Sequence, residues 1–126
     1  MSQGNYDHPT YLTRQQLALG RTTAGAAGTS LQKAFTNDMR IRNVSALVIT
    51  AGTATTHNLT VRNGTTSVGL ITLSTSTALT VTTSGDLNYL LPKGSVLNVL
   101  NGADATGVAD VTVEAHTDAQ SNWVGL

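Results

Sequence analysis

Cysteine is absent from this chain of 126 residues, which also has a single tryptophan, a single phenylalanine and two prolines. Without cysteine the chain can form neither a disulfide framework nor a thiolate metal site. No run approaches the roughly 20 apolar residues that cross a membrane. The first residues also lack the basic and apolar regions of a signal peptide. We therefore expect no membrane association, and synthesis in the cytoplasm without export.

Charged and aromatic residues are scarce as well, at 11% and 4% of the chain, whereas threonine is abundant. β-Branched side chains suit a pleated, half-buried surface, so the composition favours a single β domain. Each large apolar side chain contributes about 1.5–3 kcal/mol when it is fully buried, and this chain has few of them. We therefore expect the domain to bury surface against copies of itself or another partner.

Short runs of β-branched and aliphatic residues alternate with turn signals between Arg40 and His116. Runs that recur about every 8–12 residues are typical of sandwiches and barrels. The runs predict about seven strands, or eight if a segment before them adds one, and no helix longer than two turns. The predicted strands cover residues 41–50, the hairpin 59–68, then 70–74, 79–83, 87–91, 96–100 and 108–115. We expect an all-β fold, an antiparallel β-sandwich of the Greek-key or jelly-roll type.

The dipeptide Asn63-Gly64 is the strongest local signal, because it stands between two alternating runs. Asn-Gly favours a two-residue type I′ turn in which both central residues take positive φ. The predicted register pairs Leu59 with Val68, and Val61 with Thr66.

Two other predicted strands differ in pattern. The near-continuous apolar run 44–50 predicts a strand buried on both faces. Residues 108–115 alternate cleanly, which predicts one buried and one solvated face. The buried face is expected to carry Val111, Val113 and Ala115.

The beginning of the chain differs from the rest in charge. Residues 1–42 carry five basic and two acidic side chains (5 − 2 = +3), and residues 43–126 carry two basic and five acidic ones (2 − 5 = −3). A basic segment on an acidic domain suits docking on an acidic surface. The other interpretation is that three charges either way are ordinary scatter.

We divide the chain into an N-terminal arm (1–37), a β-sandwich domain (38–118) and a C-terminal tail (119–126). The small residues of 21–30 predict a linker or an extended strand. An extended arm of thirty residues would reach on the order of 100 Å, far enough to contact neighbouring subunits. A disordered terminus is the alternative.

No set of residues predicts catalysis. The histidines His8, His57 and His116 are far apart in the chain, and no serine stands in a G-x-S-x-G turn. No phosphate-binding loop, dinucleotide fingerprint or zinc-ligand spacing occurs. We therefore expect a protein that is not an enzyme and that holds no cofactor.

Metal and nucleic-acid binding are weakly supported. Asp86, Asp104 and Asp110 could gather around Ca²⁺, which prefers oxygen ligands from loops. A turn position for Asp104 and a solvated strand face for Asp110 explain the same residues, and we prefer this interpretation. No stripe of basic residues interleaves with aromatic ones, so no nucleic-acid partner is expected.

The end of the predicted domain has a turn-and-strand pattern that carries a family resemblance. It reads Pro92-Lys93-Gly94-Ser95-Val96-Leu97 and then Thr106-Gly107-Val108-Ala109-Asp110-Val111-Thr112-Val113. Together with the basic arm before a Thr-rich β domain, this pattern resembles the small decoration, or cement, proteins of tailed-bacteriophage heads. Similar closing hairpins occur in phage head fibres and tail components.

The resemblance implies a virion protein that binds the outside of the assembled capsid, commonly as a homo-trimer. Such proteins bridge neighbouring subunits of the major capsid protein and resist internal DNA pressure, and their N-terminal arm often binds the capsid. We expect the arm to lay apolar side chains into capsid grooves and to pair its arginines with acidic shell residues. The expected capsid-binding residues are Tyr6, Tyr11, Leu12, Arg14, Leu17 and Arg21.

Phe35 and Trp123 are expected to contact another copy or the capsid. Tryptophan is enriched at interfaces, although Trp123 could instead fold back onto its own sandwich. The alternative function is a carbohydrate- or receptor-binding module of a head fibre or tail. That function needs an aromatic-lined site, and Tyr89 is the one aromatic residue between Arg40 and His116.

Overall fold

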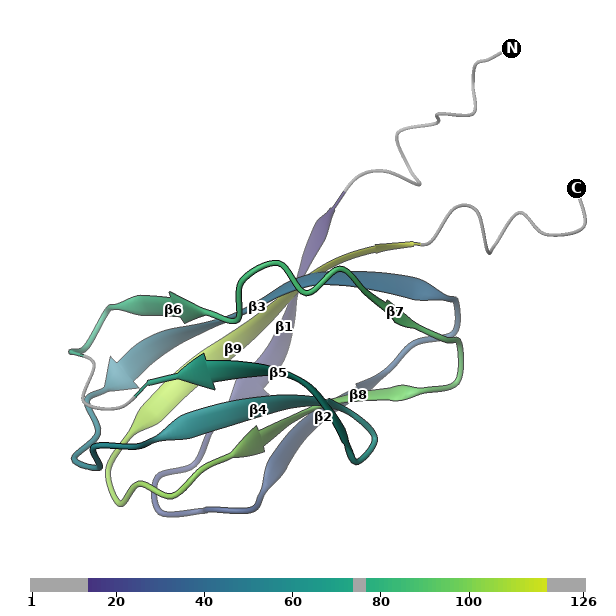
Figure 1. Ribbon diagram of the computed structural model, residues 1–126. Coiled ribbons are helices and arrows are strands. Elements are labelled where there is room, and N and C mark those ends of the chain that lie inside the picture. The colour runs from purple at the N-terminus through teal and green to yellow at the C-terminus, as the bar shows by residue number, and fades with distance from the viewer. Residues whose placement is uncertain (1–13, 74–76, 118–126) are drawn as a thin grey trace, which may run out of the picture.

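The structure, a computed structural model, describes residues 14–73 and 77–117. This part of the chain contains nine β-strands and no helix. The strands form two sheets that lie face to face (Figure 1). Their bounds are β1 Gln15–Arg21, β2 Ser30–Ala34, β3 Met39–Thr50, β4 Asn58–Asn63, β5 Thr66–Thr72, β6 Val81–Thr83, β7 Tyr89–Leu91, β8 Val96–Asn101 and β9 Val108–Thr117.

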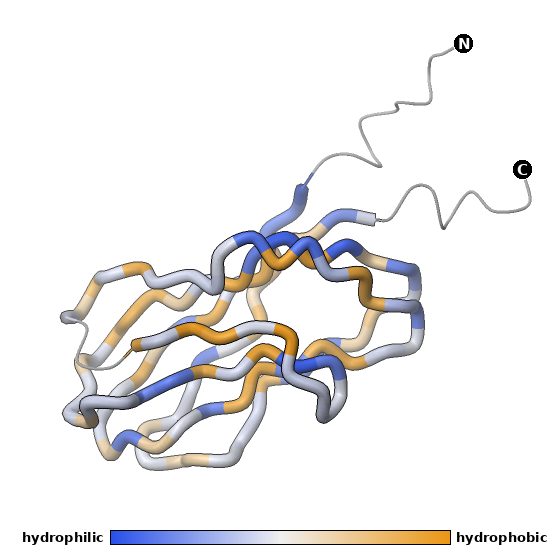
Figure 2. The backbone as a smooth tube through the Cα atoms, in the orientation of Figure 1, coloured by the Kyte–Doolittle hydropathy of each residue, from blue (hydrophilic) through white to orange (hydrophobic). Residues whose placement is uncertain are grey.

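Sheet I has the strand order β1-β9-β3-β6, with β7 also pairing with β3, and sheet II has the order β2-β8-β4-β5. Every recorded pairing is antiparallel. The predicted all-β antiparallel sandwich is therefore confirmed. Polar and apolar residues alternate along the strands, because successive side chains point to opposite faces of a sheet (Figure 2).

The core lies between the sheets and consists mainly of small and medium aliphatic side chains. Its buried members are Phe35, Met39, Ile41, Val44, Ala46, Val48, Leu59, Val61, Ile71, Leu73, Leu91, Leu97, Val99, Ala109, Val111, Val113 and Ala115. The predicted buried face of residues 108–115 is confirmed, since its three members all belong to this core. The intervening side chains of β9 are half-buried.

Strand β3 does not follow its predicted pattern. Val44, Ala46 and Val48 are buried, but Leu47 and Ile49 are only half-buried, so the prediction of burial on both faces was wrong. No described element covers the outer face of sheet I, so side chains on that face keep partial exposure to solvent.

The predicted register of the β4–β5 hairpin was also wrong. Leu59 pairs with Ile71 and Asn63 pairs with Thr66, so the two turn residues are Gly64 and Thr65. Only Gly64 has positive φ, at 60°, whereas a type I′ turn requires two such residues. A bulge between Val61 and Arg62 in the register shifts the partners further along β5. A bulge cannot be read from alternation, because it places one extra residue on one strand.

The boundary at residue 37 between arm and domain was drawn too late in the chain. Strand β1 pairs with β9 at the edge of sheet I, and β2 pairs with β8 at the edge of sheet II. Residues 15–34 thus supply one edge strand to each sheet. Their small and polar residues hid this role, because an edge strand needs only a few inward apolar side chains, here Leu17, Leu19 and Leu31.

The two ends of the sandwich differ in what they contain. At one end, Gln15 of β1 pairs with Ala115 of β9, and Met39 of β3 pairs with Thr117 of β9. Residues 1–13 and 118–126 therefore join neighbouring strands at this end, which we call the terminal end. The opposite end, the loop end, contains the connections 22–29, 51–57 and 102–107.

Candidate functional site

A cluster of buried polar side chains lies at the loop end. Asp104, His57 and Asn101 are 7%, 1% and 4% exposed. Asn101 is the last residue of β8, Asp104 belongs to the loop before β9, and His57 directly precedes β4. Buried polar groups are costly unless they are hydrogen-bonded, so the partners of each group decide what this cluster does.

The Asp104 carboxylate accepts hydrogen bonds from four backbone N–H groups in two loops. The donors and their shortest N–O distances are Thr53 at 3.0 Å, Ala54 at 2.9 Å, Thr106 at 2.9 Å and Gly107 at 2.8 Å. The hydrogen bonds from Thr106 and Ala54 lower the pKa of this carboxyl most, and they outweigh the burial that raises it. The pKa therefore lies well below its ordinary range, and Asp104 is an anion held by backbone dipoles.

Gly52 allows the two loops to approach this closely. A Cβ atom at residue 52 would overlap the Asp104 carboxylate. A larger residue would therefore push apart the loops that the carboxylate joins.

Asn101 connects the cluster to a third loop. Its Nδ2 donates to the carbonyl oxygens of Thr23 at 3.2 Å and Ala26 at 3.3 Å, and its Oδ1 lies 3.0 Å from His57 Nε2. Because the amide oxygen is the acceptor here, His57 Nε2 must donate. The network thus links the connections 22–29, 51–57 and 102–107, and we call it the loop-end network.

The other ring nitrogen, His57 Nδ1, has no hydrogen-bond partner in the structure. It lies 3.9 Å from Asp104 Oδ2, and both side chains are almost completely buried. The imidazole and the carboxylate are therefore neighbours, but their separation is longer than a hydrogen bond.

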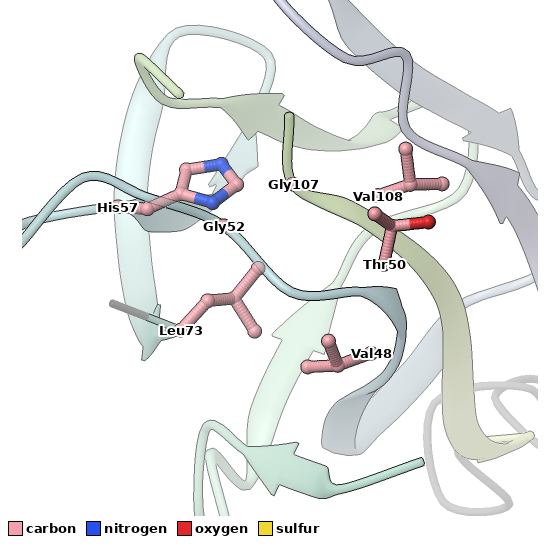
Figure 3. A pocket seen from close by; sticks show the side chains of 7 residues that line it. All are labelled: Val48, Thr50, Gly52, His57, Leu73, Gly107 and Val108. Atoms are coloured by element: carbon pink, nitrogen blue, oxygen red, sulfur yellow. The ribbon is translucent and has the colours of Figure 1, made fainter. Parts of the chain in front are cut away.

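A cavity of about 10 Å³ lies beside His57 (Figure 3). Its lining residues are Val48, Thr50, Gly52, His57, Leu73, Gly107 and Val108. A volume of roughly 10–15 Å³ holds about one water molecule. The cavity is too small for an organic substrate, and the network around it joins loops to one another.

The structure pairs both predicted arm arginines with carboxylates of their own chain. Arg14 Nη1 lies 3.2 Å from Glu114 Oε1. Arg21 makes a two-pronged contact to Asp110, with distances of 2.6 and 3.0 Å. Both carboxylates belong to β9, so these arginines already have acidic partners without a capsid.

Leu17 and Phe35 lie against or inside the core. Leu17 is half-buried and packs onto the core, and Phe35 is a core residue that is 9% exposed. The expectation that Phe35 contacts another copy or the capsid stays a prediction, although its ring is buried in its own domain. The other expected contact residues, Tyr6, Tyr11, Leu12 and Trp123, lie outside the described residues.

The three aspartates considered for Ca²⁺ have separate partners. Asp86 pairs with Arg42 at 2.9 Å and Asp110 pairs with Arg21, whereas Asp104 belongs to the loop-end network. Within residues 14–73 and 77–117, no group of three or more His, Cys, Asp or Glu side chains is arranged to hold a metal.

Tyr89, the residue considered for carbohydrate binding, is half-buried on β7. Its hydroxyl accepts a hydrogen bond from Asn63 Nδ2 at 2.8 Å. The phenol therefore joins β7 of sheet I to β4 of sheet II, and this geometry gives no support to a sugar-stacking role.

Sequence reasoning placed Asp104 in a turn and noted His57 only as one of three separated histidines, so it did not bring the two residues together. Two signals were present in the sequence. Asp104 belongs to a short predicted loop, 102–107, that begins and ends with glycine. Gly52 comes shortly after the long predicted strand 41–50. Neither signal reveals a contact between residues that are about fifty positions apart.

In comparisons with known proteins, no family model and no curated protein matched the chain. In the part of the chain that the structure describes, no helix is long and apolar enough to cross a membrane.

Proposed function

We propose that the chain is a structural protein that binds the exterior of a phage capsid through its two terminal segments. It would bridge neighbouring subunits of the major capsid protein and so stabilise the head. The observation that carries the proposal is the position of Gln15 beside Ala115. Residues 1–13 and 118–126 are thereby joined to adjacent strands at the terminal end, and both can reach one surface.

The residue types of these two segments support the proposal. The chain has five aromatic residues, and three of them, Tyr6, Tyr11 and Trp123, belong to residues 1–13 and 118–126. Tyrosine and tryptophan are enriched among the residues that dominate binding energy at protein interfaces. A sandwich that carries both segments at one end therefore has a chemically distinct binding end.

The structure of the loop end supports a purely structural role for the sandwich, as a rigid body. The Asp104 carboxylate is occupied by backbone N–H groups, and Asn101 joins a third loop to the network. Polar groups whose hydrogen bonds are made to the protein's own backbone hold the loops in place. A rigid body between two attachment segments suits a protein that bridges subunits and resists expansion of a shell.

The proposal is tested with heads of the cognate phage that lack this protein. The full chain, a variant without residues 1–13, and Trp123→Ala are each mixed with heads and sedimented. We expect the full chain to saturate at a fixed number of copies per head, and both variants to lose at least tenfold in affinity. The deletion stops before β1, so the sandwich should keep its circular dichroism spectrum and melting temperature.

Thr55→Ala provides the matched control, because Thr55 is an exposed residue at the loop end. It should bind heads like the unchanged chain. If the deletion variant and Trp123→Ala still decorate heads at full occupancy, binding through the terminal segments is excluded.

A further inference from the structure

The large apolar residues that are exposed in the described part of the chain all belong to, or directly precede, strands at the same edge of the sandwich. They are Leu70, Leu79 and Val81, which are 51%, 79% and 60% exposed. Leu70 belongs to β5, the edge strand of sheet II, and Val81 begins β6, at the edge of sheet I. Strands β5 and β6 contact each other at this side of the molecule (Figure 1). We call β5 and residues 77–83 the β5–β6 flank.

Leu79 combines exposure with a strained backbone. Its φ is +65°, a left-handed conformation that is unfavourable for residues with a Cβ atom. It is the third residue of a turn in which Thr80 N donates to Thr77 O at 3.3 Å, a position where positive φ favours Gly or Asn. An exposed leucine at such a position has two unfavourable features at once, which indicates a contact made by this side chain.

Strand β5 has an unprotected edge. Natural edge strands usually carry charged residues or proline that prevent pairing with another chain. Residues 63–85 contain no Asp, Glu, Lys, Arg, His or Pro. The one bulge in β5 lies near the hairpin, and residues 69–72 pair regularly with β4. The outer side of β5 therefore offers backbone groups and uncharged side chains to a further strand.

We propose that the β5–β6 flank binds the same flank of a second copy of this chain. Two β5 strands would lie side by side in antiparallel orientation around a two-fold axis, because a self-complementary contact between identical surfaces is two-fold symmetric. The flank is uncharged and the whole chain has a formal net charge of zero, so two copies do not repel each other. The opposite edge strand, β1, directly follows ion-paired Arg14 and ends with ion-paired Arg21, so it does not match an uncharged surface.

The size of the flank predicts a weak dimer. Seven residues of β5 are about 23 Å long, and two sheets about 10 Å apart with their outer side chains are about 20 Å deep. The flank therefore covers on the order of 460 Å² per copy, or about 900 Å² in a dimer, near the lower limit for specific interfaces. We expect a concentration-dependent dimer with a dissociation constant in the micromolar range. The resemblance implies a trimer, so the mass in solution distinguishes the two assemblies.

Sedimentation of the full chain from about 1 to 300 µM tests the dimer. We expect the mass to rise from one copy to two over this range. Thr72→Lys places a charge on the exposed end of β5, and Ala18→Lys places the same charge on the exposed edge strand β1. Thr72→Lys should weaken the dimer at least tenfold, and Ala18→Lys should leave it unchanged. A monomer at every concentration, a trimer, or equal effects of the two variants would overturn the proposal.

Leu79→Asn separates a contact from a purely structural role. Asparagine tolerates positive φ, so this variant should melt at the same or a higher temperature while its dimer dissociates more readily. If Leu79→Asn dimerises normally, the flank is not the dimer surface. If it reduces binding to heads while the unchanged chain is monomeric, the occupant of the flank is the capsid and not a second copy.

The absence of cysteine makes a positional test simple. Leu70 lies near the centre of β5, and Leu70→Cys should form a disulfide-linked dimer under mild air oxidation. Ala18→Cys, near the centre of β1, should remain monomeric under the same conditions. Preferential cross-linking through Ala18→Cys would place the interface on the other flank and contradict the proposal. The sedimentation, melting and cross-linking measurements do not depend on the proposed capsid function.

Discussion

Asp104 and Asp110 are six residues apart and carry the same charge, but they lie in opposite environments. Asp104 is buried at the loop end, and four backbone N–H groups hold its carboxylate. Asp110 lies on the outer face of sheet I, and the exposed guanidinium of Arg21 pairs with it at 2.6 Å. In both cases the neighbours lower the pKa of the carboxyl, through backbone hydrogen bonds at Asp104 and through Arg21 at Asp110.

The difference shows that a short distance alone does not make an interaction important for stability. Water screens the exposed Arg21–Asp110 pair, and both side chains give up freedom when they pair. The donors to Asp104 are backbone groups whose positions are set by the fold, and water cannot replace the lost acceptor easily in a buried site. We therefore expect the loop-end network to control stability, and the surface pair to contribute little.

The largest effect is expected for Asp104→Ala. Removing the carboxylate leaves several partly buried N–H groups without an acceptor, and each such group costs about 1–3 kcal/mol. The free energy of unfolding should fall by on the order of 3 kcal/mol, measured by denaturant titration. Asp104→Asn is the matched control, since it keeps the shape and one acceptor oxygen and should lose less. Equal stability of Asp104→Ala and the unchanged chain would mean that the network is not structural.

A smaller effect is expected on acidification. The folded-state pKa of Asp104 is depressed, so its contribution is fully present above the pKa of the unfolded chain, about 3.9, and is lost as pH falls toward the folded value. The stability difference between the unchanged chain and Asp104→Asn should therefore narrow below about pH 4, by up to about 1.4 kcal/mol per pH unit. Thermal melts of both proteins from pH 6 to pH 3 measure this narrowing. A difference that stays constant over this range would show that Asp104 is not the titrating group.

The smallest effect is expected for Arg21→Ala. Its partner Asp110 remains exposed to water, so the melting temperature should not change measurably at moderate salt. The same variant tests a part of the proposed function, because Arg21 was expected to pair with acidic shell residues. Normal stability with weaker head binding would support that role. Normal stability with normal head binding would show that Arg21 does not bind the shell and that its role is limited to the ion pair with Asp110.

The sequence predicted the fold class from local patterns that survive in the folded chain. Alternation in residues 108–115 identified the buried face of β9, and the turn signals separated most strands correctly. Residues 15–34 were assigned to an arm because edge strands bury few side chains and therefore show little periodicity. The hairpin register was wrong because the turn residues are Gly64 and Thr65, and because a bulge between Val61 and Arg62 shifts the partners further without leaving a local signal.

The sequence by itself determined that this chain folds as β-strands, because its β-branched runs and turns act over a few residues. It also determined that no disulfide contributes, because the chain has no cysteine. Only the tertiary structure decided that Asp104 reaches Thr53 and Ala54, that Gln15 lies beside Ala115, and that the strands of Leu70 and Val81 contact each other at one edge of the sandwich. Such contacts join residues from about ten to a hundred positions apart, and they depend on strand order and register, which result from packing of the whole core.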